Sequence, residues 1–126
     1  MTENELAKIV VQKVYEIHTA IGPGLLESVY QRILAYELRL EKLKVETEVV
    51  IPIEWKGHKL DESFRADLIV EDKILLELKA VSEMKDVYLK QTLTYLKLTD
   101  IKLGLLINFG AADVSSGVKR VVNGLN

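Results

Sequence analysis

The sequence predicts an α/β fold in which one mixed β-sheet of about four to five strands is flanked by helices. Three observations support this prediction. Residues 3–20 and 25–43 repeat apolar side chains at helical spacing, so the chain is expected to begin with two amphipathic helices. Residues 64–80 have the pattern of two strands joined by a short polar turn. Residues 103–109 are apolar almost throughout, which is typical of a strand covered by helices on both faces.

Length and composition favour a single domain spanning residues 1–126. Of these residues 48% are hydrophobic and 29% are charged, which is enough to bury one core. The absence of cysteine excludes disulfides and thiolate zinc sites. The chain has no apolar run that could span a bilayer and no signal-peptide pattern, so we expect a cytoplasmic protein without a membrane partner. Because the net charge is −2, nucleic-acid binding would need a local basic patch or a metal ion.

The first expected helix covers residues 3–20, and Thr2 or Asn4 could cap it. Its buried stripe follows the i, i+3, i+4 spacing and comprises Leu6, Ile9, Val10, Val14 and Ile17. His18 lies near the end of this helix. A lone histidine in such a place is more often a packing or capping residue than a metal ligand.

The segment Gly22-Pro23-Gly24 separates this helix from the next one. The second expected helix covers residues 25–43. Glu27 falls in its first turn, where the helix dipole favours a carboxylate, so a purely structural role would explain this residue. Tyr30 follows three residues later and shares the helix face of Glu27.

Residues 45–55 change to a β pattern, with Pro52 indicating an edge strand or a bulge. The turn signal Lys56-Gly57-His58 then predicts a short second strand that leads towards Phe64. Trp55, beside the Pro52 edge, could offer the interface of a homodimer.

Residues 64–80 form the expected central hairpin. The chain after this hairpin is expected to form a helix over residues 85–98 and the buried strand over 103–109. A last helix is expected over residues 115–123, with the basic pair Lys119-Arg120 on it. The predicted order of elements is therefore α-α-β-β-β-β-α-β-α.

Besides Arg65, the strands of the hairpin over residues 64–80 contain three charged residues that a buried sheet would normally exclude, namely Asp67, Glu77 and Lys79. If the turn is centred on Asp72, then Asp67 and Glu77 are equidistant from it and lie directly opposite each other, with Cβ atoms roughly 4.5–5.5 Å apart. Because strand side chains alternate, Lys79 shares the face of Glu77, while Leu78 points to the other face.

Two carboxylates this close repel each other unless something positive lies between them. Mg²⁺ would meet that need, since it is held by one or two carboxylates together with water and substrate phosphate. Lys79 could then position the attacking water or stabilise charge on the phosphate. The alternative is a cross-strand salt bridge, in which Lys79 neutralises Asp67 or Glu77.

Three motifs in the sequence resemble those of a known group of enzymes. Asp67 followed by Glu77-Leu78-Lys79 looks like the signature of the PD-(D/E)xK nuclease superfamily. The segment from Gln91 to Tyr95 is similar to the Q-x-x-x-Y element of its RecB-like branch. The stretch from Gly24 through Glu27 to Tyr30 matches the motif that names the GxxExxY protein family, which is assigned to the same superfamily.

The resemblance implies a restriction-endonuclease-like core with the carboxylates at one end of the central hairpin. It also implies a metal site made of Asp67, Glu77 and the backbone carbonyl of Leu78, supplemented by Glu27. The metal would be Mg²⁺, with Mn²⁺ as a substitute. Lys79 would hold the water nucleophile or the scissile phosphate.

Other residues are implied in substrate contact or in support of the site. Gln91, Tyr95 and Tyr30 belong to this group by resemblance. A histidine near the position of His18 is frequent in the family and could support the site indirectly. Arg65 is added from strand parity alone, because in a regular strand it shares the face of Asp67 and could meet a phosphate.

The function implied by these residues is a Mg²⁺-dependent nuclease that cleaves DNA, with RNA left open. The alternative is a catalytically inactive module of the same fold that binds nucleic acid or a protein partner. Binding is expected to be weak and salt-dependent unless the basic side chains converge on one face. Those side chains are Arg32, Arg39, Lys85, Lys90, Lys119 and Arg120.

Overall fold

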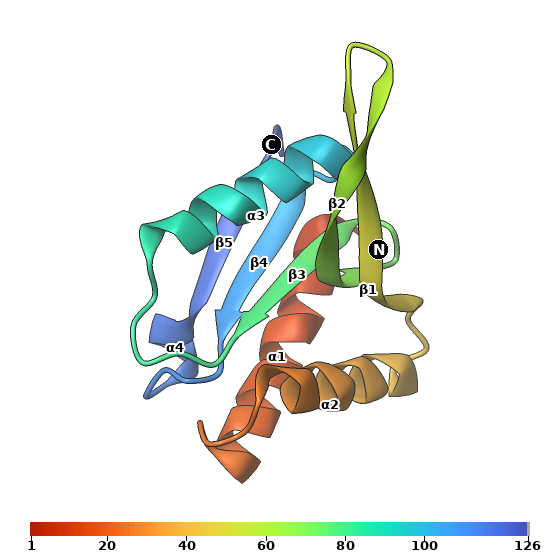
Figure 1. The fold of residues 1–126 in the computed structure, drawn as a ribbon. Helices are drawn as coiled ribbons and strands as arrows, with labels where there is room; N and C mark the ends of the chain where they lie inside the picture. The colour runs from red at the N-terminus through yellow and green to blue at the C-terminus, as the bar shows by residue number, and fades with distance from the viewer. Residues whose placement is uncertain (126) are drawn as a thin grey trace.

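The computed structural model describes residues 1–125, and its centre is a five-stranded sheet whose strands follow chain order from one edge to the other (Figure 1). The strands are β1 (Val45–Trp55), β2 (His58–Val70), β3 (Ile74–Lys79), β4 (Leu103–Asn108) and β5 (Val118–Val122). The β3–β4 pair is parallel and the other three pairs are antiparallel. The prediction of a mixed sheet with about five strands is therefore confirmed.

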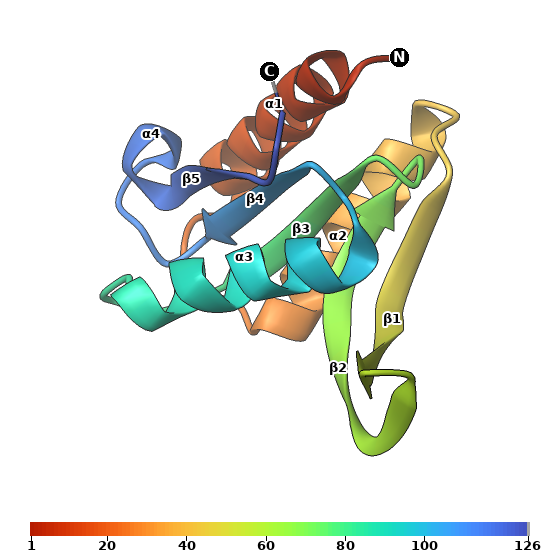
Figure 2. The same cartoon turned by 90° about the horizontal axis from the view of Figure 1, so that it is seen from above.

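Helices cover both faces of the sheet (Figures 1 and 2). They are α1 (Glu3–Ile21), α2 (Glu27–Leu40), α3 (Asp86–Thr99) and the single-turn α4 (Val114–Gly117). The larger core cluster lies between the sheet and the α1–α2 pair, and a smaller one lies under α3. Because α3 connects the parallel strands β3 and β4, it forms the crossover that such a pair requires.

A side-chain cap marks the start of α1, as the sequence predicts. Thr2 caps α1 in a reciprocal capping box with Glu5, which satisfies two backbone N–H groups. Gly22 ends α1 with a φ of 84°, a conformation that glycine adopts without steric cost. The break before α2 therefore lies where the glycine and proline residues indicate.

The prediction of two strands over residues 58–70 is wrong, because a single strand, β2, covers the whole stretch. The polar residues Asp61, Glu62 and Ser63 lie in the middle of this strand. They are exposed, however, since this part of β2 pairs only with β1 and projects with it beyond the sheet (Figure 1). A ribbon with solvent on both faces has no need of apolar residues, so polarity alone does not mark a strand end here.

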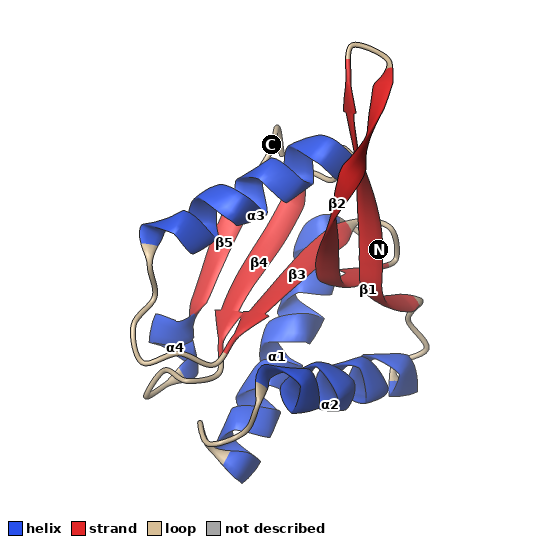
Figure 3. Ribbon diagram, in the orientation of Figure 1, coloured by secondary structure: helices blue, strands red, loops and turns tan. Residues whose placement is uncertain are grey.

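The prediction of a final helix over residues 115–123 is also wrong. After the single turn of α4 the chain enters β5, and Lys119 and Arg120 lie on this edge strand (Figure 3). Gly117 explains the change, because a Cβ at this position would lie 2.6 Å from the carbonyl oxygen of Asn108. The backbone at Gly117 thus approaches the end of β4 closely, and the valines that follow favour a strand.

The β1–β2 hairpin ends in a two-residue turn at Lys56 and Gly57, both with positive φ. This turn type matches the right-handed twist of the strands that flank it. Trp55 and His58 face each other across the turn, and the Trp55 side chain is 69% exposed.

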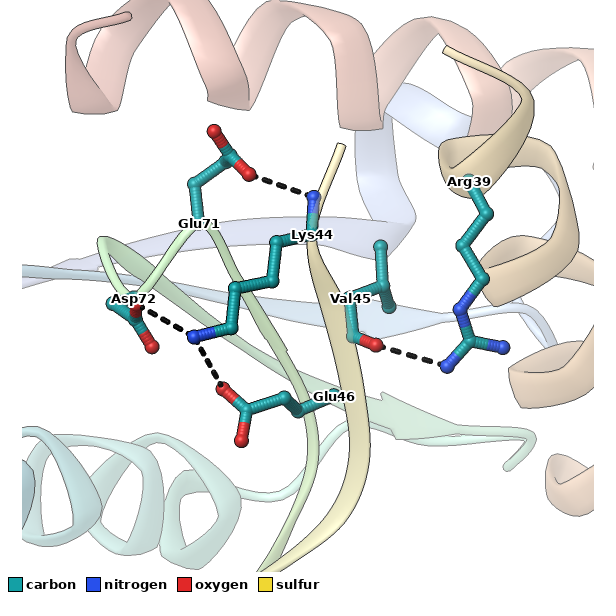
Figure 4. Close-up of polar contacts among 6 residues, drawn as sticks. All are labelled: Arg39, Lys44, Val45, Glu46, Glu71 and Asp72. Atoms are coloured by element: carbon teal, nitrogen blue, oxygen red, sulfur yellow. Dashed lines mark hydrogen bonds and ion pairs between the residues drawn. The ribbon is translucent and has the colours of Figure 1, made fainter. Parts of the chain in front are cut away.

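The turn between β2 and β3 is centred on Asp72, as predicted, since Val70 pairs with Ile74. A polar network holds it against the chain before β1 (Figure 4). Glu71 accepts a hydrogen bond from the backbone N–H of Lys44 at 2.6 Å, and the Lys44 ammonium reaches Asp72 at 3.0 Å. The closed end of the hairpin is therefore anchored, and its other end is where the strands separate.

Candidate active site

The candidate site lies at the point where β2 and β3 diverge. Backbone pairing between these strands ends at Leu68 and Leu76, and the next step of the same register brings Asp67 to Glu77. The backbone N–H of Asp67 donates to Glu77 Oε1 at 3.2 Å, and the N–H of Leu78 donates to Asp67 Oδ2 at 2.7 Å. The two carboxylates thus meet inside the fork and take the place of the next backbone hydrogen bonds.

Neither carboxylate has a cationic partner. Among residues 1–125, no lysine, arginine or histidine nitrogen lies within 4.0 Å of Asp67 or Glu77. One oxygen of each group accepts a backbone N–H, while Asp67 Oδ1 and Glu77 Oε2 accept no hydrogen bond from the described residues. The salt-bridge alternative is therefore not the arrangement observed.

Burial changes the acidity of both groups. The Glu77 side chain is only 8% exposed, and desolvation, followed by the charge of Asp67, raises the pKa of Glu77 to about 8. Desolvation also raises the pKa of Asp67, although the Leu78 N–H and the charge of Lys79 act in the opposite direction. A carboxyl pair with raised pKa values and free oxygens is a favourable place for a cation.

Lys79 points to the α3 side of the sheet together with Glu77. Its ammonium lies 4.5 Å from the centre of the Tyr88 ring, a cation–π contact with the first turn of α3. The side chain is half-buried, and its charge lowers the pKa of both carboxyls. Lys79 is therefore close enough to act on the site electrostatically.

Glu27 is the first residue of α2, and Tyr30 holds the loop before it. Tyr30 is fully buried, stacks on Phe109 at 4.2 Å, donates a hydrogen bond to the carbonyl of Gly22 and accepts one from the N–H of Leu25 at 3.1 Å. Tyr30 therefore supports this loop, and its side chain has no exposed surface that could contact a substrate.

Glu27 is exposed at the start of α2 and acts on the site through its charge. A pocket of about 370 Å³ is lined by Glu27 and its neighbours and by Ala80, the residue after Lys79. The charge of Glu27 raises the pKa of both Asp67 and Glu77. No group of three or more Asp, Glu, His or Cys side chains in residues 1–125 is gathered closely enough to hold a metal ion by itself. Glu27 thus acts on the pair from a distance.

Tyr95 lies on α3 near the carboxylates, and Gln91 lies on the same helix. Burial and the charges of Glu77 and Asp67 raise the pKa of Tyr95, which places its phenol near the carboxylates. The Tyr95 ring also contacts Phe64 of β2, with centroids 5.1 Å apart. Gln91, one helical turn earlier, is exposed, so its amide is free to meet a ligand.

The parity argument for Arg65 fails in the structure. Ala66 packs in the cluster under α3, whereas Leu68 packs in the cluster on the α1–α2 side. Regular alternation would place these two residues on one face, so the strand changes face at Asp67. Arg65 is exposed, and strand parity no longer links it to the carboxylates.

Sequence reasoning missed Glu48. This residue lies opposite Asp67 on β1, between the pairs Thr47–Leu68 and Val49–Ala66, and has a φ of 49°. Its charge raises the pKa of Asp67. A left-handed glutamate within a strand has no sequence signature, since glycine or asparagine is the usual residue there.

His18 lies outside the carboxylate cluster. Its Nε2 is 2.8 Å from the carbonyl oxygen of Ala111, so the ring joins α1 to the loop after β4. Two of the basic side chains make their contacts elsewhere. Arg39 donates to the carbonyl of Val45, and Arg120 donates to Asn4 on α1.

The donor set fits a divalent cation. Two adjacent carboxylates, each with an uncommitted oxygen, form the oxygen-rich site that Mg²⁺ prefers, and Mg²⁺ keeps several of its waters in such a site. Leu78, whose backbone carbonyl is the further expected ligand, lies between Glu77 and Lys79 on β3. The residues present therefore suit a metal that is held by few protein ligands.

A mixed sheet with a crossover helix and an acidic pair at the fork of its central hairpin defines the restriction-endonuclease-like class of folds. The model of the PD-(D/E)XK nuclease superfamily matches residues 4–121, and the chain belongs to this superfamily. Its members generally use divalent metals such as Mg²⁺. Membership of the narrower GxxExxY family stays a prediction.

Comparison with solved structures agrees on the fold. A crystal structure of SSO0001 is similar to this chain, with 22% sequence identity and a TM-score of 0.58. The match covers 98% of this chain and 60% of that one, so the chain spans 60% of the length of SSO0001. No curated protein matches the sequence significantly. In residues 1–125, no helix has the length and apolar character needed to cross a bilayer.

Proposed function

We propose that this protein is a Mg²⁺-dependent nuclease that hydrolyses phosphodiester bonds of DNA, with Mn²⁺ able to replace Mg²⁺. The observation that carries the proposal is the buried pair of Asp67 and Glu77, which among the described residues has free oxygens and no cationic partner within 4.0 Å. Burying two carboxylates together is costly, and a bound cation would offset that cost. Membership of the nuclease superfamily supports the same reading.

Asp67, Glu77 and the Leu78 carbonyl would hold the metal, with Glu27 acting through a retained water. Bound there, Mg²⁺ would polarise the phosphate and lower the pKa of a coordinated water. The oxygen of the attacking water would form a bond to phosphorus and lose its proton to solvent, while the bond to one sugar oxygen breaks and that oxygen takes up a proton.

Lys79 would hold a phosphate oxygen or the attacking water. Its ammonium is a compact charge with three donors, and its position over Tyr88 limits its freedom. Because it lies on the same face as Glu77, two residues further along β3, it can act on the phosphate that the metal binds. Gln91 and Tyr95 would contact the substrate from α3.

The proposal is tested by titrating Mg²⁺ and Mn²⁺ calorimetrically into the wild type and the Asp67→Asn variant. Cleavage is measured in parallel on single-stranded, duplex and branched DNA and on RNA. We expect metal binding and metal-dependent cleavage in the wild type. In the variant, cleavage should fall by roughly 100-fold or more, because a metal ligand and its charge are lost.

Asp61→Asn is the matched control, since it makes the same change on the exposed part of the same strand. It should leave binding and cleavage unchanged. Metal binding without cleavage of any substrate would indicate the inactive binding module instead. A wild type that binds no metal, with or without nucleic acid, would contradict the proposed metal site and with it the nuclease function.

A further inference from the structure

Strand β3 loses one of its two neighbours where the candidate catalytic residues begin. Its pairing with β2 ends at Leu76, so backbone pairing of the segment Glu77–Lys79 continues only with β4. The last pair of that ladder joins Lys79 to Asn108. The orientation of Lys79 therefore depends on what holds the end of β3 to the end of β4.

The Asn108 side chain provides that connection. It is 6% exposed, and its Oδ1 accepts the N–H of Val81 at 3.0 Å while its Nδ2 donates to the carbonyl of Val81 at 3.0 Å. The amide thus pairs with both backbone groups of Val81, as a peptide group of a neighbouring strand would. Next to it, the N–H of Phe109 donates to the carbonyl of Lys79 at 2.8 Å.

Gly110 allows this close approach. A Cβ at position 110 would lie 2.4 Å from the carbonyl oxygen of Val81 and 2.7 Å from its nitrogen. The N–H of Gly110 also donates to Asn108 Oδ1 at 2.9 Å, so this oxygen accepts two hydrogen bonds. The backbone on both sides of the amide is therefore fixed.

The loop that leaves this connection leads directly to Tyr88, the ring that contacts the Lys79 ammonium. Holding Val81 thus restricts the lysine backbone and also the path of the chain that brings Tyr88 over the lysine. Both restraints act on the same ammonium group.

We propose that Asn108 is a positioning residue for Lys79. The amide acts through the backbone of residues 79–81 and has no contact with the carboxylate pair among the bonds it makes. This inference rests on the proposed function, because it concerns the step in which Lys79 meets phosphate or water.

The test compares Asn108→Ala with Asn123→Ala in the full chain. Asn123 is a matched control, because its amide also bridges backbone carbonyls, those of Leu96 and Ile101, next to the opposite end of β4. We expect kcat of Asn108→Ala to fall roughly 10- to 100-fold, since small displacements of a catalytic group have effects of this size. The KM for DNA and the Kd for Mg²⁺ should change by less than about threefold, and Asn123→Ala should keep the kcat of the wild type.

A double-mutant cycle separates positioning from general destabilisation. In the Lys79→Ala background, Asn108→Ala should cause almost no further loss of kcat, because the group it positions is absent. An independent and equal loss in that background, or an equal loss of kcat in Asn123→Ala, would overturn the proposal. Asn108→Ser, which keeps a polar group at the buried position, replaces Asn108→Ala if the alanine variant does not fold.

Amide hydrogen exchange gives a readout that does not require cleavage. The backbone N–H groups of Lys79 and Val81 should exchange about tenfold or more faster in Asn108→Ala than in Asn123→Ala. Without the Asn108 side chain, local opening of this segment no longer has to break its hydrogen bonds to Val81. Unchanged exchange at these amides would overturn the positioning role. If the wild type cleaves no substrate, the proposed nuclease function fails, while this comparison still decides whether Asn108 holds Lys79.

Discussion

The Glu77 carboxyl group is buried beside a second carboxyl group, and this gives the fold a defined dependence on pH. Its pKa is about 8 in the folded protein, against an ordinary value of 4.5. Between these two values the folded state keeps a proton that the unfolded chain releases. The contribution of Glu77 to stability therefore falls as the pH rises from 4.5 to 8, and below 4.5 it is independent of pH.

We expect Glu77→Gln to be more stable than the wild type at pH 8 in the absence of divalent metal. The neutral amide can still accept the Asp67 N–H and carries no charge into the fork. The advantage should be on the order of a few kcal/mol at most at pH 8 and should vanish near pH 4.5, since each pKa unit corresponds to about 1.4 kcal/mol. Urea denaturation across this pH range measures it.

Glu62→Gln is the control, because Glu62 is exposed on the projecting hairpin. Its stability should follow that of the wild type at every pH. A Glu77→Gln variant whose stability falls with pH in parallel with the wild type would contradict the assignment of this pH dependence to Glu77.

The charged residues of the site were accessible to prediction to different degrees. Asp67, Glu77 and Lys79 could be grouped from the sequence because a short turn fixes strand register. Glu48 and Arg65 could not be placed correctly, since both depend on the irregular backbone at the level of Asp67. A prediction from strand parity assumes regular alternation of side chains, and the backbone is not regular where the strands diverge.

At the scale of elements, the start of α2 depends on one buried tyrosine. The Tyr30 hydroxyl bonds to both Gly22 and Leu25, and so fixes the loop from which Glu27 projects. We expect Tyr30→Phe to lower the free energy of unfolding by about 1–2 kcal/mol, because two partly buried backbone groups lose a partner. Cleavage should also weaken, because Glu27 is no longer held in place.

Thermal unfolding and the cleavage assay measure these effects. Tyr36→Phe is the control on the same helix, since the Tyr36 side chain is 62% exposed. It should leave both properties unchanged. Equal effects of the two substitutions would show that the Tyr30 hydroxyl has no special part in holding the loop.

Elements governed by local pattern were predicted well, and those governed by tertiary contacts were not. The spacing in α1, α2 and α3 is repeated over several turns, so their positions follow from periodicity. The segment 118–122 becomes a strand because Gly117 approaches the end of β4 and the free edge of β4 lies beside it. The sequence of the segment itself does not show that this edge of β4 is available for pairing.

At the scale of the whole molecule, metal binding and proton release should be coupled. Because Glu77 is largely protonated below pH 8, a metal held by this carboxylate, as proposed, would have to displace its proton. We expect the apparent affinity for Mg²⁺ to fall by up to about tenfold for each pH unit below 8. The rise in melting temperature caused by a fixed Mg²⁺ concentration should shrink accordingly.

Calorimetry in two buffers of different ionisation enthalpy provides a direct measurement. Near pH 7 the observed enthalpies should differ in proportion to about one proton released for each Mg²⁺ bound, and near pH 9 they should agree. Equal enthalpies in the two buffers at pH 7 would show that the metal binds elsewhere or that Glu77 is already ionised.

The length of chain between two paired strands affects the order in which the pairs can form during folding. A three-residue turn joins β2 to β3, so closure of a short loop brings Asp67 and Glu77 together. The β3–β4 ladder instead requires the entire α3 crossover to form, and non-local pairing of this kind is slow. A refolding chain should therefore assemble its acidic pair before Asn108 can hold the end of β3, and would be able to capture a metal before its lysine is in place.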